Sequence, residues 1–289
     1  MTLNLYTLSV KKDSSKSDLT QGEITSVVYH DIFDYPMDFK DLIKWRAADG
    51  LVNNEAEVVV RGGHVFKMGR EGLVYKKQLR YRISQKKLQI AKKSSFFMSK
   101  IPFIKMIGVT GSLAMNNSTE QSDIDLLVIT ERNRLWITRL VSIFLLKLFN
   151  IPTRRSGDPN QKDKICLNMW LDEDSLVWKK ERNLYTAHEI AQVKALFNKS
   201  KTYEKFLKKN MWILNYWPNS VKIENKKTLK EKFVKKNFLI KTFDYFENIA
   251  YQFQYKRMKN KITHETVGKK IALFHPQDWG EVVLTRLSS

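Results

Sequence analysis

The stretch from Gly108 to Thr130, GVTGSLAMNNSTEQSDIDLLVIT, contains residues whose types and spacing could do chemistry. Side chains alternate along a strand, so Asp123 and Asp125 would point to the same face, about 7 Å apart. Two unpaired carboxylates on one face repel each other and raise each other's pKa. A divalent cation would remove that repulsion, because Mg²⁺ binds one or two carboxylates together with substrate phosphates.

Gly111 and Ser112 lie shortly before this pair of acids. A glycine lets the backbone turn tightly and has no side chain to hold a phosphate away. Ser112, at the expected start of a helix, offers a hydroxyl and free backbone N–H groups to an anion. Together the four residues predict a site for a metal–triphosphate complex.

The resulting pattern, G-S-x10-D-x-D, resembles the signature of the DNA polymerase beta-like nucleotidyltransferase superfamily, in particular its minimal and aminoglycoside-modifying members. The core of that likeness covers about residues 102–172. A wider likeness is to uncharacterised bacterial nucleotidyltransferase-domain proteins with a winged-helix-like N-terminus. The stretches that suggest it include YHDIFDYP, DKICLNMWL, NLYTAHEIAQVKAL and ALFHPQ.

The resemblance implies a role for each residue of the motif. Asp123 and Asp125 would be catalytic and would hold Mg²⁺ or Mn²⁺, while Gly111 and Ser112 would bind the β- and γ-phosphates of a nucleoside triphosphate. Ser122, in the connecting loop, would help to bind the nucleotide. The reaction would transfer a nucleoside monophosphate to an acceptor hydroxyl and release pyrophosphate. The sequence does not identify the acceptor, which could be RNA, DNA or a protein.

One feature departs from the family pattern. The family places a third carboxylate on a later strand, but the strand expected in KICLNMWL carries no acid. Cys166, Asn168 and Trp170 should share one face, and Asn168 is expected in the third position, against the nucleotide. The acids that flank this strand and could substitute are Asp163, Asp172 and Asp174. The alternative function is therefore a weakly active or inactive nucleotidyltransferase fold that serves as a nucleic-acid-binding module.

Three further positions have competing explanations. Arg154 and Arg155 could contact phosphates or could belong to a solvated loop. His188, in HEIAQ, lacks the second histidine of a zinc-protease motif, so we expect a helix surface or a structural hydrogen bond. Cys166 is expected to be a small buried hydrophobic residue.

Hydrophobic periodicity predicts the elements that would position the site. Strands are expected at 104–110, 124–130 and 165–171, with a helix at 135–149. That helix lies within LWITRLVSIFLLKLFNI, residues 135–151, whose 17 residues include two basic ones. A membrane span needs about 20 predominantly apolar residues. We therefore expect a helix that covers the sheet, and no membrane span.

The N-terminal part suggests two helices followed by a hairpin. The first helix is expected at 24–33, and the second should run from an N-cap at Asp38 to a stop at Gly50. The hairpin would pair 57–60 with 65–68. This order predicts a winged-helix-like lobe, which could read DNA or dock a protein.

The chain carries 51 Lys and Arg against 30 Asp and Glu, a net charge of +21. Such an excess favours a polyanionic partner, although a solvated surface would also explain it. Residues 76–100 contain nine basic residues and no acid, and 199–270 contain nineteen basic residues and six acids. Helical spacing in the first block would place Leu79, Ile83, Ile90 and Phe97 on one face. In the second it would bury Leu239, Phe243, Phe246, Ala250 and Phe253.

The sequence as a whole predicts an α+β protein in which a mixed sheet with helices forms a polymerase beta-like nucleotidyltransferase core. The expected segments are a flexible leader (1–20), a winged-helix-like domain (21–75), a basic helical connector (76–101), the core (102–180) and a C-terminal helical region (181–289). Cys166 is the single cysteine, which rules out an internal disulfide and suits a reducing, cytoplasmic location.

Overall fold

The computed structural model describes residues 19–49, 56–155, 157–179, 181–222, 238–263, 265–274 and 279–288. Most of the expected leader and the expected helix stop at Gly50 lie outside these ranges. The helices are α1 (Gln21–Asp31), α2 (Phe39–Lys44), α3 (Gly72–Met98), α4 (Gly111–Ala114), α5 (Leu135–Leu148), α6 (Leu184–Ala191), α7 (Thr202–Lys209), α8 (Phe238–Met258) and α9 (Trp279–Ser288), with short 3-10 turns η1 (Met211–Asn215) and η2 (Lys259–Lys261).

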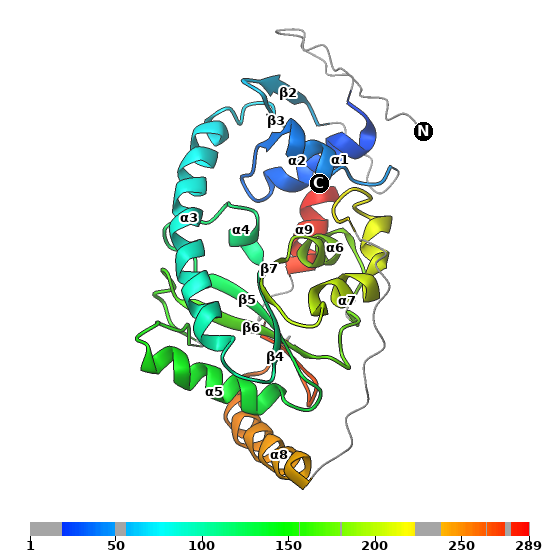
Figure 1. Cartoon of the computed structure of the whole chain (residues 1–289). Helices are drawn as coiled ribbons and strands as arrows, with labels where there is room; N and C mark the ends of the chain where they lie inside the picture. The colour runs from blue at the N-terminus through cyan, green and yellow to red at the C-terminus, as the bar shows by residue number, and fades with distance from the viewer. Residues whose placement is uncertain are drawn as a thin grey trace.

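A mixed sheet forms the centre of the molecule (Figure 1). Within the described ranges its strand order is β7-β4-β5-β6-β9-β8. β5 is antiparallel to β4 and parallel to β6, so the central strands are buried between neighbours. The strands are β4 (Ile104–Val109), β5 (Ile124–Thr130), β6 (Ile165–Asp172), β7 (Lys194–Asn198), β8 (Thr266–Val267) and β9 (Ile271–Leu273). The predicted α+β class with a mixed sheet is confirmed.

Helices cover both faces of this sheet. One face of β5 presents Leu127 and Ile129 to a core shared with α1, α2, α6 and α9. The other face presents Leu126 and Val128 to a core shared with α3, α5 and α8. The alternation of buried side chains along β5 explains why this strand is apolar throughout.

The N-terminal lobe has the elements expected from its sequence. Asp38 caps α2 by accepting a hydrogen bond from the backbone N–H of Asp41 at 2.8 Å. The hairpin strands β2 (Val58–Arg61) and β3 (His64–Lys67) are joined by Gly62 and Gly63, whose positive φ angles suit a tight turn. The expected extent of α2 was wrong, because this helix ends at Lys44. The winged-helix-like character of the lobe stays a prediction.

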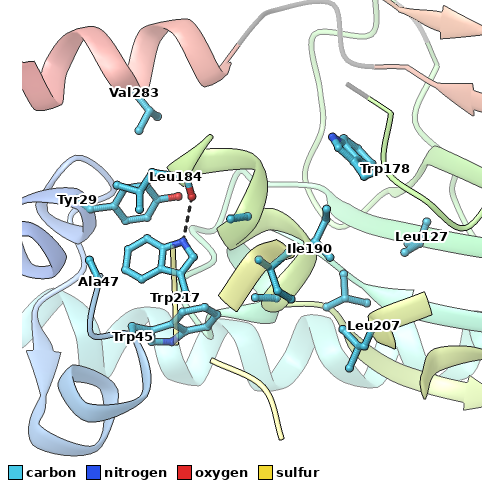
Figure 2. Packing of buried hydrophobic residues seen from close by; sticks show 14 of the residues in the cluster. Tyr29, Trp45, Ala47, Leu127, Trp178, Leu184, Ile190, Leu207, Trp217 and Val283 are labelled. Atoms are coloured by element: carbon cyan, nitrogen blue, oxygen red, sulfur yellow. Dashed lines mark hydrogen bonds between the residues drawn. The ribbon is translucent and has the colours of Figure 1, made fainter. Parts of the chain in front are cut away.

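The lobe shares its core with the C-terminal half of the chain (Figure 2). Trp45 and Trp217 are fully buried with ring centroids 6.0 Å apart. The indole N–H of Trp217 donates to the backbone carbonyl of Leu184 on α6 at 2.9 Å. Val283 of α9 lies in the same cluster. Segments far apart in the sequence therefore pack as one hydrophobic unit.

The long helix α3 connects the lobe to the sheet (Figure 1). Most of its buried residues are small or polar, namely Ser84, Lys87, Ala91, Ser94 and Ser95, and the other two are Leu73 and Met98. Of the expected apolar face, Ile90 and Phe97 pack against the core, whereas Leu79 is half exposed. The small residues let α3 approach its neighbours closely, and polar groups of this helix bind a neighbouring loop.

The helix α8 packs against α5 through polar groups. The Glu247 carboxylate accepts hydrogen bonds from the backbone N–H groups of Trp136 and Ile137, at 2.7 and 2.9 Å, and so caps the start of α5. Of the expected apolar stripe, Ala250 is buried, but Phe246 is 49% exposed. Phe243 and Phe253 are also exposed, so the expectation of a buried aromatic stripe was wrong. The Leu239 side chain lies outside the description.

Among the described helices, none combines the length and the apolar character that a membrane crossing requires.

Candidate active site

The two acids of the motif lie at the beginning of β5. Asp123 immediately precedes the strand and Asp125 is its second residue. Asp125 shares its face with Leu127 and Ile129, on the side of the sheet that carries the N-terminal lobe and α6. Asp123 is 8% exposed, whereas Asp125 is partly open to solvent. The strand thus delivers both carboxylates to one place, as the alternation predicts.

Gly111 lies directly against Asp125. Its φ angle is +57°, and a Cβ built on it would be 2.8 Å from the Asp125 Oδ2 atom. The backbone N–H of Thr110 also donates to the carbonyl of Asp125 at 3.1 Å. Both the backbone angle and the lack of space therefore require glycine at this position. The G-S and D-x-D parts of the motif meet in space.

Asp123 already has a cationic partner in the structure. The Nη1 atom of Arg154 is 2.7 Å from Oδ2 of Asp123 and also approaches the Cys166 sulfur at 3.8 Å. Arg154 comes from the loop between α5 and β6. The structure thus distinguishes the two arginines of this loop: Arg154 contacts the acid pair, whereas Arg155 is exposed.

Asp125 is held in surroundings that disfavour its charge. Burial and the nearby charge of Asp123 raise the pKa of Asp125 to about 7. A hydrogen bond from the Cys166 thiol, the charge of Arg154 and a hydrogen bond from Asn168 oppose this shift. The amide Nδ2 of Asn168 donates to Oδ1 of Asp125 at 2.7 Å. At neutral pH Asp125 is therefore partly protonated, and a bound cation would favour its ionised form.

Asn168 reaches Asp125 because β6 is irregular. Asp125 pairs with Cys166, but Leu127 pairs with Met169, so β6 contains one extra residue between these positions. The bulge keeps both Cys166 and Asn168 beside Asp125. It also moves Trp170 into the core on the opposite face. The expectation that Cys166, Asn168 and Trp170 share one face was therefore wrong for Trp170.

The donor set fits a hard divalent cation in part. One ligand atom each from Asp123, Asp125 and Cys166 lie within 4.8 Å of one another. Carboxylates suit Mg²⁺ or Mn²⁺, whereas a thiol does not. Burial and the two carboxylates raise the pKa of the Cys166 thiol, so it stays protonated. The buried Oδ1 of Asn168 has no hydrogen-bond partner among the described residues. The two carboxylates and this oxygen are the chemically suitable ligands.

The acids that flank β6 do not complete the pair. Asp163 is 2.6 Å from the ammonium of Lys87. Asp172 pairs in register with Thr130, at the far end of β5 from Asp125, and accepts hydrogen bonds from the backbone of Asn133 and Asp174. Asp174 is paired with Arg132 and Lys270. Among the described residues, none of the three flanking acids joins the group that Asp123 and Asp125 form with Cys166.

Another acid, Glu189 of α6, feels the charge of Asp125. Burial, and then repulsion from Asp125, raise the pKa of Glu189 to about 8, while a hydrogen bond from Gln192 opposes the shift. Sequence reasoning missed this residue because it comes from a helix rather than a strand. Its neighbour His188 is buried among aromatic rings, so the expectation of a helix surface was wrong there.

The loop between α4 and β5 is fastened by α3. Lys87 is 1% exposed, and its ammonium donates to the carbonyls of Glu120 and Ser122 at 3.2 and 2.8 Å. The hydroxyl of Ser84 accepts from the backbone N–H of Ser118 at 3.0 Å. These contacts fix the chain immediately before Asp123. Nothing in a lysine-rich run distinguishes Lys87 from its exposed neighbours, so the sequence could not reveal this role.

The two serines of the motif differ in their surroundings. The hydroxyl of Ser112, the residue after Gly111, lies 3.3 Å from the hydroxyl of Ser118. The hydroxyl of Ser122 donates to the carbonyl of Thr119 at 2.8 Å and so closes a turn. Ser112 is available to a ligand through its backbone and hydroxyl, whereas the contacts of Ser122 are those of a loop.

Comparison with known protein families agrees with this geometry. The model of the nucleotidyltransferase domain matches residues 90–263, more than half of the chain. The protein therefore belongs to the nucleotidyltransferase-domain family, consistent with the polymerase beta-like superfamily. The matched range contains the motif, the central strands, Arg154, Asn168 and Glu189. A search of curated proteins found no match.

Proposed function

We propose that this protein transfers a nucleoside monophosphate from a nucleoside triphosphate to an acceptor hydroxyl. The observation that carries the proposal is the convergence of Gly111, Asp123 and Asp125, within a chain of the nucleotidyltransferase-domain family. The acceptor oxygen forms a bond to the α-phosphorus, the bond between this phosphorus and the bridging oxygen breaks, and pyrophosphate leaves. The proton of the acceptor hydroxyl passes to a base.

Asp123 and Asp125 would hold Mg²⁺ or Mn²⁺. When bound, such an ion supplies positive charge to the triphosphate and to the leaving pyrophosphate. Asn168 orients the Asp125 carboxylate through its amide hydrogen bond. Gly111 lets the backbone at the start of α4 lie directly against Asp125, and Ser112 offers its hydroxyl to a phosphate.

Glu189 is our candidate for the missing third acid. Burial, and then the charge of Asp125, raise its pKa to about 8, so Glu189 is mostly protonated at pH 7 and ionises as the pH rises above neutrality. A base with a pKa close to the working pH is well suited to accept a proton from a hydroxyl. We therefore expect Glu189→Gln to lower the transfer rate more than it weakens nucleotide binding.

The test is transfer of label from α-labelled ATP, GTP, CTP and UTP, with Mg²⁺ or Mn²⁺ and with total RNA, DNA or cell lysate as acceptors. The Asp123→Ala, Asp125→Ala protein should show no transfer. Glu120→Ala removes an exposed acid of the same loop and serves as the matched control. Transfer that survives in the double variant would disprove the assignment of the acids.

The second candidate function is a nucleic-acid-binding module with little activity. Arg154 favours it, because its guanidinium already neutralises Asp123. In this case the wild-type protein labels no acceptor but binds RNA or DNA tightly. Arg154→Ala then decides between the two functions. If the protein is a nucleic-acid-binding module, the variant should bind polynucleotides more weakly. If Arg154 only competes with the metal ion for Asp123, the variant should bind the metal more tightly.

A further inference from the structure

A large cavity adjoins the acid pair at the edge of β6. Its volume is about 1030 Å³, and its walls come from β6, α5, the end of α8 and the loop segments 150–155 and 157–158. β9 pairs with β6 from Met169 to Leu171, and the earlier part of β6, where Ile165 is bridged to Thr153, forms a wall of the cavity. Small-molecule sites typically measure about 300–1,000 Å³. The cavity can therefore hold a ligand of nucleotide size.

The cavity is connected to the acids through two of its lining residues. Arg154 lines it and donates to Asp123, and Asn168 lines it and donates to Asp125. The acids themselves are not among its lining residues, and neither are Gly111 and Ser112, which we assign to the triphosphate. A ligand in the cavity would therefore approach the reacting centre from another direction than the triphosphate.

Positive charge dominates the lining. Asp158 and Glu265 are its acids, and Asp158 is already paired with Lys164 at 2.6 Å. The basic residues of the lining are Arg139, Lys147, Arg154, Arg155, Lys164 and Arg257. Positively charged clefts with apolar walls concentrate anions, because the low-dielectric walls focus the field.

Arg139 gives the clearest indication of an anionic ligand. Its Nη1 donates to the neutral side chain of Gln254 at 2.6 Å, and its guanidinium lies 4.8 Å from the ring of Phe274. Its buried Nε has no hydrogen-bond partner in the described part of the chain. Burial lowers the pKa of Arg139 only to about 10, so the group stays charged at pH 7. A buried cation with neutral partners is costly unless an anion joins it.

We infer that this cavity is the acceptor site and that the acceptor carries phosphate groups. The inference rests on the proposed function and specifies its substrate class. Arg139 and Arg257 would bind the phosphate, while the hydroxyl to be modified would lie near Arg154, beside the acids. The shared chemistry is a phosphate ester, either a free sugar phosphate or nucleotide, or the end of a polynucleotide. The positive lining disfavours cationic acceptors.

Binding to the full-length protein tests the inference without relying on catalysis. Titration calorimetry would compare ribose 5-phosphate with ribose, and a 5′-phosphorylated hexaribonucleotide with its unphosphorylated form. We expect saturable binding only when the phosphate is present. Arg139→Gln and Arg257→Gln should each weaken it roughly tenfold, the loss of one charged hydrogen bond. Lys208→Gln, on the exposed surface of α7, should leave it unchanged.

Further variants keep the result interpretable. Arg139 is partly buried, with its Nε away from solvent, so Arg139→Gln could also disturb folding. Arg139→Lys retains the charge and should retain part of the affinity if the site recognises an anion. Arg257 is exposed, so Arg257→Gln tests the same cavity without a folding risk. Affinity that rises with the hexamer and falls steeply with salt indicates a polynucleotide end. Equal affinity for both phosphorylated probes indicates a small phosphate ester.

The acid pair separates this inference from the proposed function. Asp123→Ala, Asp125→Ala should abolish transfer but leave phosphate-dependent binding in place. Equal binding of ribose and ribose 5-phosphate by the wild type would overturn the inference, and so would unchanged binding in both arginine variants. Phosphate-dependent binding without any transfer in the wild type would disprove the proposed function and the acceptor role, leaving a phosphate-binding cavity.

Discussion

Two groups of ionisable side chains lie on the same side of the central sheet. Asp123 and Asp125 sit at the start of β5 beside Arg154. His30 and His188 are packed within a cluster of aromatic rings, with their ring centroids 5.1 Å apart, among Tyr29, Trp45 and Trp217. The histidines are buried and Asp125 is partly open to solvent, and the surroundings of the two groups act on their charges in different ways.

The acid pair is in direct contact with groups that favour a negative charge, whereas burial dominates in the histidine cluster. Arg154 donates to Asp123. Hydrogen bonds from Cys166 and Asn168 oppose the rise in the pKa of Asp125, which is about 7, so Asp125 can ionise near neutral pH. Burial lowers the pKa of His30 to about 4 and that of His188 well below its usual range, so both are neutral at pH 7. Buried ionisable groups form a candidate site only where partners support a charge and a cavity gives access.

Replacing Asp125 by Asn should have the largest effect on activity. Loss of a residue that acts only in the reacting complex can cost on the order of 10³ in rate, and label transfer measures it. The folded-state pKa of about 7 lies above the ordinary value, so ionised Asp125 destabilises the fold above pH 7 and not below about pH 4. The variant should therefore melt no lower than wild type at pH 8. A sharply lower melting temperature would make Asp125 a structural residue.

Trp217→Ala should have the largest effect on stability. Removing a fully buried tryptophan costs about 3–5 kcal/mol, and it also leaves the Leu184 carbonyl without its indole partner. Denaturant titration would measure the loss, with Trp279→Ala as the control because that ring is 45% exposed. If the remaining folded protein binds nucleotide normally, the cluster is structural. Selective loss of nucleotide binding at full stability would contradict this distinction.

Lys87→Met tests whether the acids depend on a buried cation from α3. The variant loses charged hydrogen bonds to Asp163 and to two loop carbonyls, which should cost about 2 kcal/mol of stability. Transfer should also fall, because the loop before Asp123 loosens. Lys86→Met, its exposed neighbour, should change neither quantity. Equal effects of the two variants would show that burial of Lys87 does not matter.

The histidine cluster predicts a pH dependence of opposite sign to that of Asp125. The pKa of His30 is about 4 in the folded protein and near 6.5 in the unfolded chain, so the unfolded chain binds more protons between these values. The free energy of unfolding should fall by about 1 kcal/mol from pH 7 to pH 5.5 through His30 alone. Urea titrations of wild type and His30→Asn should show a weaker decline in the variant, whatever its stability at pH 7. An equal decline would assign the dependence to other groups.

The smallest effect is expected from the exposed lysines of α3. Lys86, Lys92 and Lys93 are exposed. Lys87 is buried, so it is left unchanged in this experiment. If α3 binds duplex DNA, each lysine that neutralises a phosphate contributes about 0.9 to the slope of log affinity against log salt. The triple change to Gln should flatten that slope. An unchanged slope would assign these lysines to solvation, and would leave the cavity as the place where positive charge matters.

The sequence by itself determined the local features of this protein. Apolar runs and alternation predicted β4, β5, β6 and α5, and Asp38 and the Gly62–Gly63 pair fixed a helix cap and a hairpin turn. The spacing of Gly111 and Asp125 predicted a site in which they meet. These features depend on neighbours a few residues apart, where backbone angles, side-chain alternation and short hydrogen bonds decide the outcome.

Only the tertiary structure decided the partners of these residues. A one-residue bulge in β6 brings Asn168 to Asp125, and the loop before β6 brings Arg154 to Asp123. Lys87 is buried while the adjacent lysine is exposed, and Glu189 reaches the charge of Asp125 from a helix. Pairing register, burial and charge interactions across the fold depend on atoms that are distant in the sequence, so no local pattern encodes them.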